Sequence, residues 1–327
     1  MTANIFCATV TFVVLVVASG QLFDWEQYND YDAVLPEGVK VFKTKVEKWP
    51  ALKAFLVTAD VRKYKVPRGW DLQTALSANA TTHLSTVQEF SRDFDAIVAT
   101  NGGFFGTSEG IGLSYSLAAM ESKLLSPNMQ SLSRSGQLYY PTRCAFGINK
   151  KSSFDAYWVY ESDSGGIWAY DKPSPNIQSS SPQEVPSDKF PTAAIDWDIV
   201  SGVGGGPMLV FRSVDVSLES YDAEVMWGSG VPALVAAART AIGIGTPLNL
   251  NMTSPQLLWM VVDGVDDITG VTIPDIASEF IELGAESACN LDGGGSTQFI
   301  VNQTLVNSPN GAAYQRALAA GVLMFKL

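Results

Sequence analysis

The stretch that decides the fold reads Asn290-Leu291-Asp292-Gly293-Gly294-Gly295-Ser296-Thr297, three consecutive glycines flanked by carboxylate, carboxamide and hydroxyl side chains. Residues 285–291 before it are mostly small or apolar, and residues 298–301 after it resemble a strand. Glycine reaches positive φ without a Cβ clash, and uncovered N–H groups in such a turn can form an anion-accepting concavity. The sequence therefore predicts two strands meeting at a turn whose rim carries Asp292 and Ser296.

An ordinary Asp-Gly hairpin turn is the structural alternative for the same stretch. Such a turn needs only two special residues. Three glycines would weaken a purely structural hairpin, because glycine packs no side chain and loses more entropy on folding. The composition thus favours a functional turn, and the hairpin stays open as the alternative.

The composition describes a globular protein with a substantial core. The chain has 327 residues, of which 46% are hydrophobic and 17% are charged, and its formal net charge is −12. Length alone allows one or two domains, and we expect one large domain. No cluster of Lys and Arg follows the chain in a way that would track a phosphate backbone, so nucleic acid is not an expected partner. The sequence does not decide the oligomeric state.

Local patterns predict strands and occasional helices along the chain. Apolar runs predict strands at 54–61, 96–100, 257–262 and 318–325. Periodicity predicts helices at 84–94 and after Thr272, where Asp275 completes a capping box and Gly284 ends the helix. The Ser, Pro and Gly-rich stretch 162–188 is typical of a surface excursion. We therefore expect a mixed α/β (α+β) fold, with mixed and largely antiparallel sheets and flanking helices in a single domain.

The N-terminus indicates secretion. Residues 1–20 contain no charged side chain, and they hold a short apolar run followed by small residues, as in a signal peptide; an uncleaved anchor is the alternative. Asn79, Asn251 and Asn302 each begin an N-glycosylation acceptor pattern. We expect a protein that is secreted or resident in the secretory lumen, with no membrane span in the mature chain. Cys144 and Cys289 either form a disulfide there or stay as buried thiols.

Further motifs accompany the glycine run in a fixed order. They are Asn101-Gly102-Gly103-Phe104-Phe105, Gly204-Gly205-Gly206-Pro207, Arg239-Thr240-Ala241-Ile242-Gly243 and Val262-Asp263-Gly264. From about residue 99 to 327 the chain resembles the phosphodiester glycosidase family, whereas residues 21–98 match only loosely. The resemblance implies hydrolysis of the bond between a sugar's anomeric carbon and a phosphodiester oxygen, in an N-acetylglucosaminyl phosphodiester-like substrate that is free or carried on a glycoconjugate.

The chemistry of that reaction assigns expected roles. The leaving phosphate monoester has a second pKa of about 6, so protonating it is less necessary than stabilising its charge. Arg239 suits that task because its planar fork can bind two phosphate oxygens. Asp292 and Asp263 are the candidates for activating water or attacking the anomeric carbon, and the sequence does not decide between base, nucleophile and hydroxyl ligand. For Arg239 the alternative is a structural ion pair.

The remaining expected substrate-binding residues surround these three. They are Asn101, Gly102, Gly103, Asn290, Gly293, Gly294, Gly295, Ser296, Thr297 and Arg316. Turn capping is the alternative for the two asparagines, and a strand-end charge is the alternative for Arg316. Glu279 resembles an acidic residue of the family, but its helix position favours a solvated face.

Some chemistries are excluded or left open by the residue inventory. The only histidine, His83, is far in sequence from every glycine motif, which argues against a Ser-His-Asp triad and against zinc sites built on several His or Cys ligands. No cofactor is required, although Asp263, Asp266, Asp267 and Asp292 offer the oxygen ligands of Ca²⁺ or Mg²⁺. A polar surface loop is the alternative for Asp266 and Asp267. Two other functions stay open: a silent carbohydrate- or phosphate-binding protein, and a hydrolase of ordinary glycosides.

Overall fold

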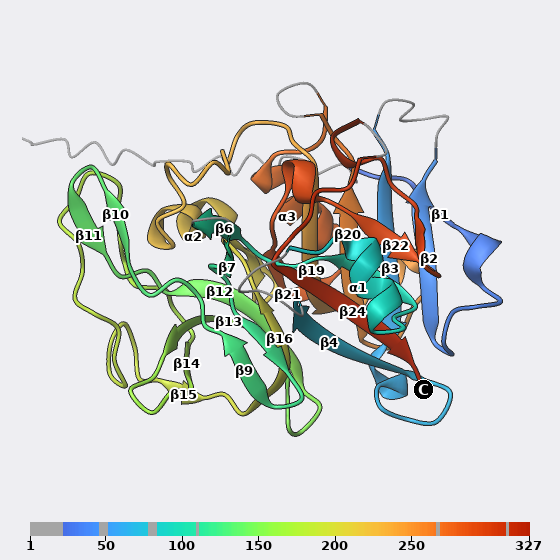
Figure 1. Cartoon of the computed structure of the whole chain (residues 1–327), viewed down its shortest axis with the longest axis horizontal. Coiled ribbons are helices and arrows are strands. Elements are labelled where there is room, and N and C mark those ends of the chain that lie inside the picture. The colour runs from blue at the N-terminus through green and yellow to red at the C-terminus, as the bar shows by residue number, and fades with distance from the viewer. Residues whose placement is uncertain (1–21, 46–51, 78–83, 109–110, 266–268, 312–313) are drawn as a thin grey trace, which may run out of the picture.

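The computed structural model describes residues 22–45, 52–77, 84–108, 111–265, 269–311 and 314–327 (Figure 1). The expected signal peptide, Asn79 and the pair Asp266 and Asp267 lie outside these residues. In the described chain, 42% of residues are in strands and 13% in helices, with several antiparallel sheets and a half-barrel. The predicted helix-flanked α/β class is therefore wrong. The sequence patterns missed most of the short strands between residues 105 and 215, and these make the fold mostly β.

Three sheets form the body of the molecule, and every strand pairing within them is antiparallel. The eight-stranded sheet has the order β1(Trp25–Gln27), β2(Val39–Thr44), β3(Ala54–Asp60), β20(Gln256–Val262), β19(Arg239–Gly245), β21(Ala285–Asn290), β17(Met208–Phe211) and β18(Val214–Asp215). The seven-stranded sheet has the order β15(Ile195–Asp196), β14(Ile167–Tyr170), β13(Phe154–Glu161), β12(Arg143–Asn149), β16(Ile199–Gly204), β8(Ala118–Met120) and β9(Lys123–Ser126). The five-stranded sheet has the order β23(Thr304–Leu305), β22(Phe299–Val301), β5(Val98–Asn101), β24(Ala320–Lys326) and β4(Trp70–Leu76).

Smaller elements complete the described chain. Two hairpins stand outside the large sheets: β10(Leu132–Arg134) with β11(Gln137–Tyr139), and β6(Phe105–Ser108) with β7(Ile111–Ser114). The helices are α1(Val87–Asp93), α2(Ser217–Ala223) and α3(Ile273–Glu282), and the short 3-10 turns are η1(Asn29–Tyr31), η2(Val61–Lys63), η3(Leu248–Leu250), η4(Gly294–Ser296) and η5(Pro309–Gly311). No helix of the described chain has the length and apolarity needed to cross a bilayer.

The continuous apolar run of β20 is explained by burial on both faces of the central sheet. Trp259 and its strand neighbours on the same face belong to the largest core cluster, which also contains Phe146 of the seven-stranded sheet and Phe299 of the five-stranded sheet. The alternate residues, such as Met260, pack with Phe280 of α3 in a second core cluster on the opposite face. Because side chains alternate across a strand, both periodic sets must be apolar when both faces are covered.

The two predicted helices exist, with the expected N-terminal caps. Thr272 and Asp275 form a capping box at α3, and Thr86 forms one with Glu89 at α1. The stretch 162–188 is only partly irregular, because it contains β14, which pairs with β13. Thus the predicted surface excursion contributes a strand to the seven-stranded sheet.

A disulfide joins the eight-stranded and seven-stranded sheets. Cys144 in β12 and Cys289 in β21 are bonded across 145 residues, with their Cα atoms 6.2 Å apart. Of the two states that the sequence left open for these cysteines, the bridge is confirmed. Closing so long a loop restricts the unfolded chain, which stabilises the fold by about 4 to 5 kcal/mol in the loop-entropy description.

Candidate active site

The glycine run crosses from one sheet to another. Asn290 ends β21 in the eight-stranded sheet, η4 follows, and Phe299 begins β22 in the five-stranded sheet. Gly294 has a φ of 55°, in the left-handed region that favours glycine. Because the flanking strands do not pair with each other, the hairpin alternative is wrong. The turn instead bridges two sheets at the edge of a cavity.

Hydrogen bonds to its backbone fix Asp292 in this turn. Its N–H donates to the carbonyl of Gly102 at 3.2 Å, and its carbonyl accepts from Asn101 Nδ2 at 2.8 Å. Asn101 Oδ1 accepts in turn from Thr240 Oγ1 at 2.8 Å. Asn101 is buried, and these contacts hold the turn against β5 and β19. The side chain of Asn101 thus bonds to the backbone of the turn, as the turn-capping alternative expects.

The other glycine motifs converge on the same place. Asn290 Nδ2 donates to the carbonyl of Gly206 at 2.7 Å, and the N–H of Gly206 donates to the carbonyl of Asn290 at 2.8 Å. A Cβ at Gly103 would lie 2.1 Å from the carbonyl oxygen of Gly204, so only glycine fits there. Asn290 is also buried and bonds to backbone. The motifs recognised separately in the sequence therefore form one packed base beneath Asp292.

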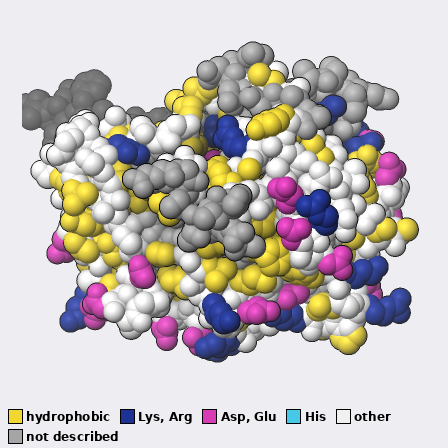
Figure 2. All heavy atoms as spheres, viewed as in Figure 1, with side chains coloured by type: hydrophobic (Ala, Val, Ile, Leu, Met, Phe, Trp, Pro, Cys, Tyr) yellow, Lys and Arg dark blue, Asp and Glu magenta, His cyan; other side chains and the backbone are white. Residues whose placement is uncertain are grey.

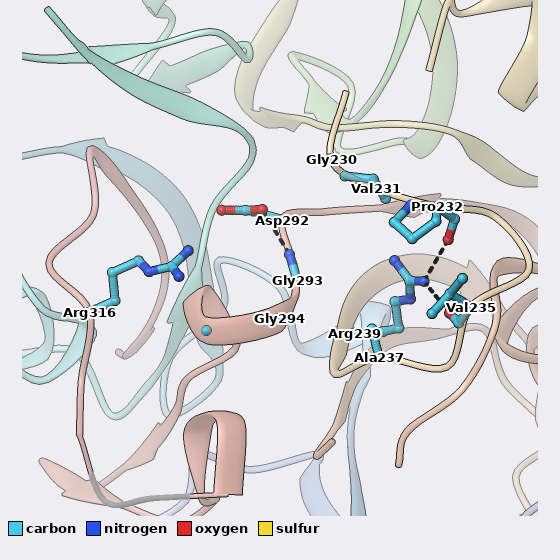
Figure 3. A pocket seen from close by; sticks show the side chains of 11 residues that line it. Gly230, Val231, Pro232, Val235, Ala237, Arg239, Asp292, Gly293, Gly294 and Arg316 are labelled. Carbon is cyan, nitrogen blue, oxygen red and sulfur yellow. Dashed lines mark hydrogen bonds between the residues drawn. The ribbon is translucent and has the colours of Figure 1, made fainter. Parts of the chain in front are cut away.

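The carboxylate of Asp292 is half-buried in the cavity wall. Its Oδ1 accepts from the N–H of Gly293 at 2.9 Å. Arg316 Nη1 donates to Ser296 Oγ at 3.2 Å, and in Figure 3 the Arg316 guanidinium and the Asp292 carboxylate face the same space. Burial raises the pKa of Asp292 above its usual range, while hydrogen bonds from Ser296 and Gly293 and the charge of Arg316 oppose that rise. The structure thus brings Asp292, the glycine turn, Ser296 and Arg316 together, as the sequence predicts.

Arg239 lies on the opposite wall of this cavity (Figure 3). Its Nε donates to the carbonyl of Val271 at 3.2 Å, and its Nη2 donates to the carbonyls of Pro232 and Val235 at 3.0 Å. Three backbone carbonyls thus accept hydrogen bonds from its guanidinium group. The contacts brace the segment 232–235, which forms part of the cavity wall.

Asp263 lines a different cavity from Asp292, together with Lys53 and Thr269. Its carboxylate accepts from Asn307 Nδ2 at 2.7 Å and from the N–H of Ser308 at 3.0 Å. Burial raises the pKa of Asp263. Asn307 Nδ2 also donates to the carbonyl of Thr297 at 3.0 Å, so Asn307 links Asp263 to the glycine turn. The structure does not bring the two predicted catalytic carboxylates together.

Two cavities meet at Asp292 and form one cleft with two lobes. Both are lined by Gly230, Val231, Asp292 and Arg316. The first lobe, of about 380 Å³, adds Arg239 and the glycine turn, and the second, of about 400 Å³, adds Arg134, Arg143 and Phe104. Among the described lining residues Asp292 is the one acidic side chain, beside four arginines. On the face shown in Figure 2, by contrast, basic and acidic side chains are intermixed.

Sequence reasoning missed Arg134 and Arg143. Arg143 is the first residue of the buried strand β12, directly before Cys144. A lone basic residue at the start of an otherwise apolar strand was the available signal, because Arg is almost never fully buried unless it has a partner.

The predicted solvated position of Glu279 on α3 is wrong. Its side chain is fully buried, and it accepts hydrogen bonds from the N–H groups of Leu22 and Phe23 and from Trp25 Nε1 at 3.1, 3.1 and 2.8 Å. The N-terminal segment, in the part of the chain that matches the family only loosely, supplies these donors. Glu279 therefore holds the segment from Leu22 to Trp25 against α3, and it is not among the residues that line the cleft.

The other predicted sites are placed as follows. Asn251 and Asn302 are exposed, and glycosylation at both stays a prediction. Asp263 and Asp292 line separate cavities, and no group of three or more His, Cys, Asp or Glu side chains gathers in the described part of the chain. Of the expected oxygen ligands for Ca²⁺ or Mg²⁺, the two described ones thus lie in different cavities. The metal dependence stays a prediction.

The phosphodiester glycosidase family profile matches residues 94–325, and the chain belongs to this family. Over 231 residues it is 25% identical to human N-acetylglucosamine-1-phosphodiester alpha-N-acetylglucosaminidase and 24% identical to the bovine enzyme of the same name. These matches cover 71% of this chain but only 37% and 36% of the two relatives.

Solved structures share the fold. The catalytic domain of the zebrafish enzyme of that name, auto-inhibited by pro-peptide, superposes with a TM-score of 0.58 at 19% identity, covering 95% of this chain and 91% of that one. A putative exported protein from Burkholderia pseudomallei gives a TM-score of 0.53 at 15% identity, covering 84% and 74%. At these identities the likeness describes the fold alone.

Proposed function

We propose that this chain hydrolyses glycosyl phosphodiesters, with Asp292 as the general base. One observation carries the proposal: among the described residues that line the cleft, one half-buried carboxylate stands with four arginines where the two lobes meet. In a chain with a net charge of −12, that local excess of positive charge favours an anionic substrate.

The number of carboxylates suits a phosphate leaving group. An ordinary glycoside needs a protonated acid to assist the departing alkoxide, and therefore a pair of carboxylic groups. A phosphate monoester, with a second pKa of about 6, departs as a stabilised anion without that assistance. Fixed guanidinium groups stabilise the charge that develops on it. One base and several arginines are therefore sufficient, and the described lining of the cleft supplies them.

The reaction takes place in one displacement. Water attacks the anomeric carbon, and its proton passes to the Asp292 carboxylate and then to solvent. The bond from that carbon to the phosphate oxygen breaks, and its electron pair leaves with the phosphate. The one carboxylate among the described lining residues favours this route over a covalent glycosyl intermediate, in which a second group would serve as acid and base. We expect inversion of the anomeric configuration.

The relatives support a proposed substrate, and the N-terminal sequence and the cysteine pair support a proposed location. The names of the human and bovine relatives specify an N-acetylglucosamine phosphodiester, so we propose an α-N-acetylglucosaminyl phosphodiester as substrate. We also propose a secreted or luminal protein, which the apolar residues 1–20 and the Cys144–Cys289 disulfide support, because disulfides persist in oxidising compartments.

The test measures turnover of α-N-acetylglucosaminyl phosphodiesters within a panel of other sugar phosphodiesters, with the product anomer followed by NMR. Asp292→Asn should lower kcat by about 10²- to 10⁴-fold, the usual contribution of a positioned base. Asp263→Asn should cost much less, and the matched control Asp198→Asn, on an exposed side chain, should cost nothing. Unchanged turnover in Asp292→Asn would refute its role. Tight binding without turnover of any member would indicate a carbohydrate- or phosphate-binding protein.

A further inference from the structure

The second lobe of the cleft has a basic wall made by two strands. Arg134 ends β10, and Arg143 begins β12. Both line the lobe together with Arg316. Arg134 is held by Nε, which donates to the carbonyl of Trp227 at 2.8 Å. Three guanidinium groups from separate parts of the chain therefore surround one space next to Asp292.

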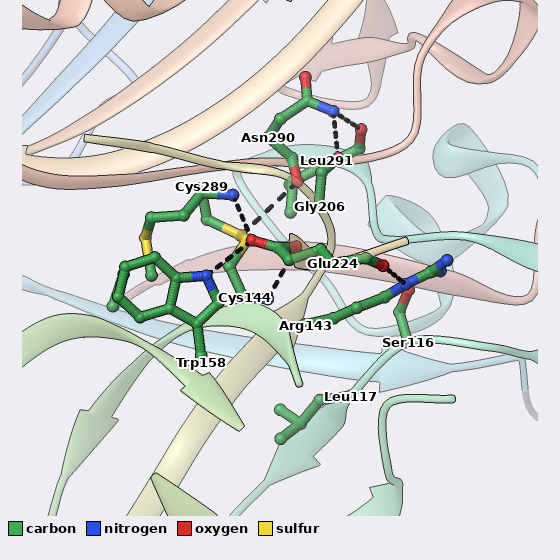
Figure 4. Close-up of a disulfide and its surroundings, with 12 residues drawn as sticks. Ser116, Leu117, Arg143, Cys144, Trp158, Gly206, Glu224, Cys289, Asn290 and Leu291 are labelled. Carbon is green, nitrogen blue, oxygen red and sulfur yellow. Dashed lines mark hydrogen bonds between the residues drawn. A yellow bond between two sulfur atoms is a disulfide. The ribbon is translucent and has the colours of Figure 1, made fainter. Parts of the chain in front are cut away.

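Arg143 is buried, yet most of its donors have no acceptor among the described residues. Its side chain is 3% exposed, and its Nε donates to the backbone carbonyl of Glu224 at 3.3 Å. Its guanidinium carbon lies 5.8 Å from the centre of the Phe104 ring. Neither terminal amino group is hydrogen-bonded within the described chain. Figure 4 shows the guanidinium pointing away from the disulfide. A buried cation with unused donors is costly unless a ligand supplies acceptors.

The nearest acid does not fill that need. The oxygens of Glu224 accept from Met208 N at 2.8 Å and Trp158 Nε1 at 2.9 Å on one side, and from Cys144 N at 3.2 Å on the other (Figure 4). Glu224 attracts Arg143 through space, but no hydrogen bond joins their side chains. Burial lowers the pKa of Arg143 to about 10, so its guanidinium remains charged at neutral pH.

Resting on the proposed function, we infer that the second lobe binds the phosphate of the leaving group, with Arg143 as its main ligand and Arg134 and Arg316 beside it. The first lobe then holds the sugar. Its wall contains Val231, Pro232 and Ala237, which suit the carbon face of a sugar ring, and the Nε and Nη2 groups of Arg239 are bonded to carbonyls. The scissile bond lies between the lobes, over Asp292.

The test measures binding of inorganic phosphate by calorimetry, without turnover, for the wild type, Arg143→Gln and Arg143→Lys. We expect Arg143→Gln to weaken phosphate binding by about tenfold or more, because charge-assisted hydrogen bonds each contribute on that scale. The phosphate affinity of Arg143→Lys should lie between those of the wild type and Arg143→Gln, since lysine keeps the charge and loses the planar fork of the guanidinium group. Arg212→Gln, on an exposed arginine outside the cleft, is the matched control and should bind like the wild type.

The outcomes separate this inference from the proposed function. Phosphate affinity unchanged in Arg143→Lys and Arg134→Gln but lost in Arg239→Gln would overturn the inference, even if diesters are hydrolysed. A chain that hydrolyses no diester, yet loses phosphate affinity in the Arg143 variants, would overturn only the enzymatic proposal. If Arg143→Gln does not fold, Arg143→Lys and Arg134→Gln decide the matter, because both keep more of the local packing.

Discussion

The side-chain amide of Asn101 donates a 2.8 Å hydrogen bond to the backbone carbonyl of Asp292, across 191 residues of sequence. This contact ties the end of β5 to the turn that carries the proposed base. Asn101 thus acts on the reaction through the position of Asp292, and its side chain does not line either lobe of the cleft.

We expect Asn101→Ala to lower kcat more than it raises KM. The turn would lose its tie to β5, and Thr240 Oγ1 and the carbonyl of Asp292 would lose their partner. Leaving such buried groups unpaired costs about 1 to 3 kcal/mol of stability each. Kinetics and denaturant unfolding measure the two effects. The matched control is Asn176→Ala, a buried asparagine that donates to the carbonyl of Ala223 outside the cleft. If both variants lose kcat equally, the effect is general instability and the positioning role is refuted.

Much of the site could be predicted because local motifs carry it. Asp292 and its glycines are adjacent in sequence, and Arg316 precedes a recognisable strand, so their grouping required little knowledge of the fold. Asp263 was expected beside Asp292 because each follows a buried strand. The two strands, β20 and β21, are not neighbours in the sheet, since β19 lies between them. Strand order, which local patterns do not determine, therefore decided which carboxylate reached the cleft.

The predicted fold class was wrong for a related reason. Strands such as β15 and β18 contain only two residues, which is too short for periodicity to reveal. Glu279 was expected in solvent because only its own helix was considered. Its partners, from Leu22 to Trp25, come from a segment 254 to 257 residues away. The pattern within one helix cannot reveal that a segment far away in the sequence buries a polar side chain of that helix.

Removing Arg316 should shift the acid limb of the pH profile upward. The charge of Arg316 favours ionised Asp292, whose pKa is already raised by burial. Without that charge the pKa rises further, so a higher pH is needed to form the active carboxylate. We expect the acid limb of kcat/KM in Arg316→Gln to move to higher pH, along with an overall loss of activity. Arg68→Gln, outside the cleft, should keep the wild-type profile. An unshifted limb would show that Arg316 does not act on Asp292.

Glu279→Ala should loosen the N-terminal segment from α3. The substitution leaves three donors, on Leu22, Phe23 and Trp25, without their acceptor. We expect a loss of about 3 kcal/mol in the free energy of unfolding, from about 1 to 3 kcal/mol for each buried group left unpaired and partial rescue by water. Protease cleavage near the N-terminus should become faster than in Glu219→Ala, whose glutamate is exposed on α2. Equal cleavage rates in the two variants would contradict this role.

Glu224 should make the fold less stable as the pH rises toward neutrality. Burial raises its pKa from 4.5 to about 7 in the folded protein, so between these values the folded chain holds a proton that the unfolded chain releases. Stability therefore falls with rising pH, by about 3 kcal/mol from this group across that window. Asp263, Glu279 and Asp292, whose pKa values are also raised, contribute with the same sign.

The variant Glu224→Gln isolates the contribution of this residue. Glutamine keeps an oxygen for Met208 N and Trp158 Nε1 but does not titrate, and its amide group faces the N–H of Cys144. We expect a protein that is less stable than the wild type at pH 5, with a flatter decline toward pH 7, measured by denaturant unfolding at each pH. Glu219→Gln, on the exposed face of α2, should keep the wild-type slope. A slope in Glu224→Gln equal to that of the wild type would mean that Glu224 is already ionised in the fold, and that its charge is held by Arg143 and the three donors around it.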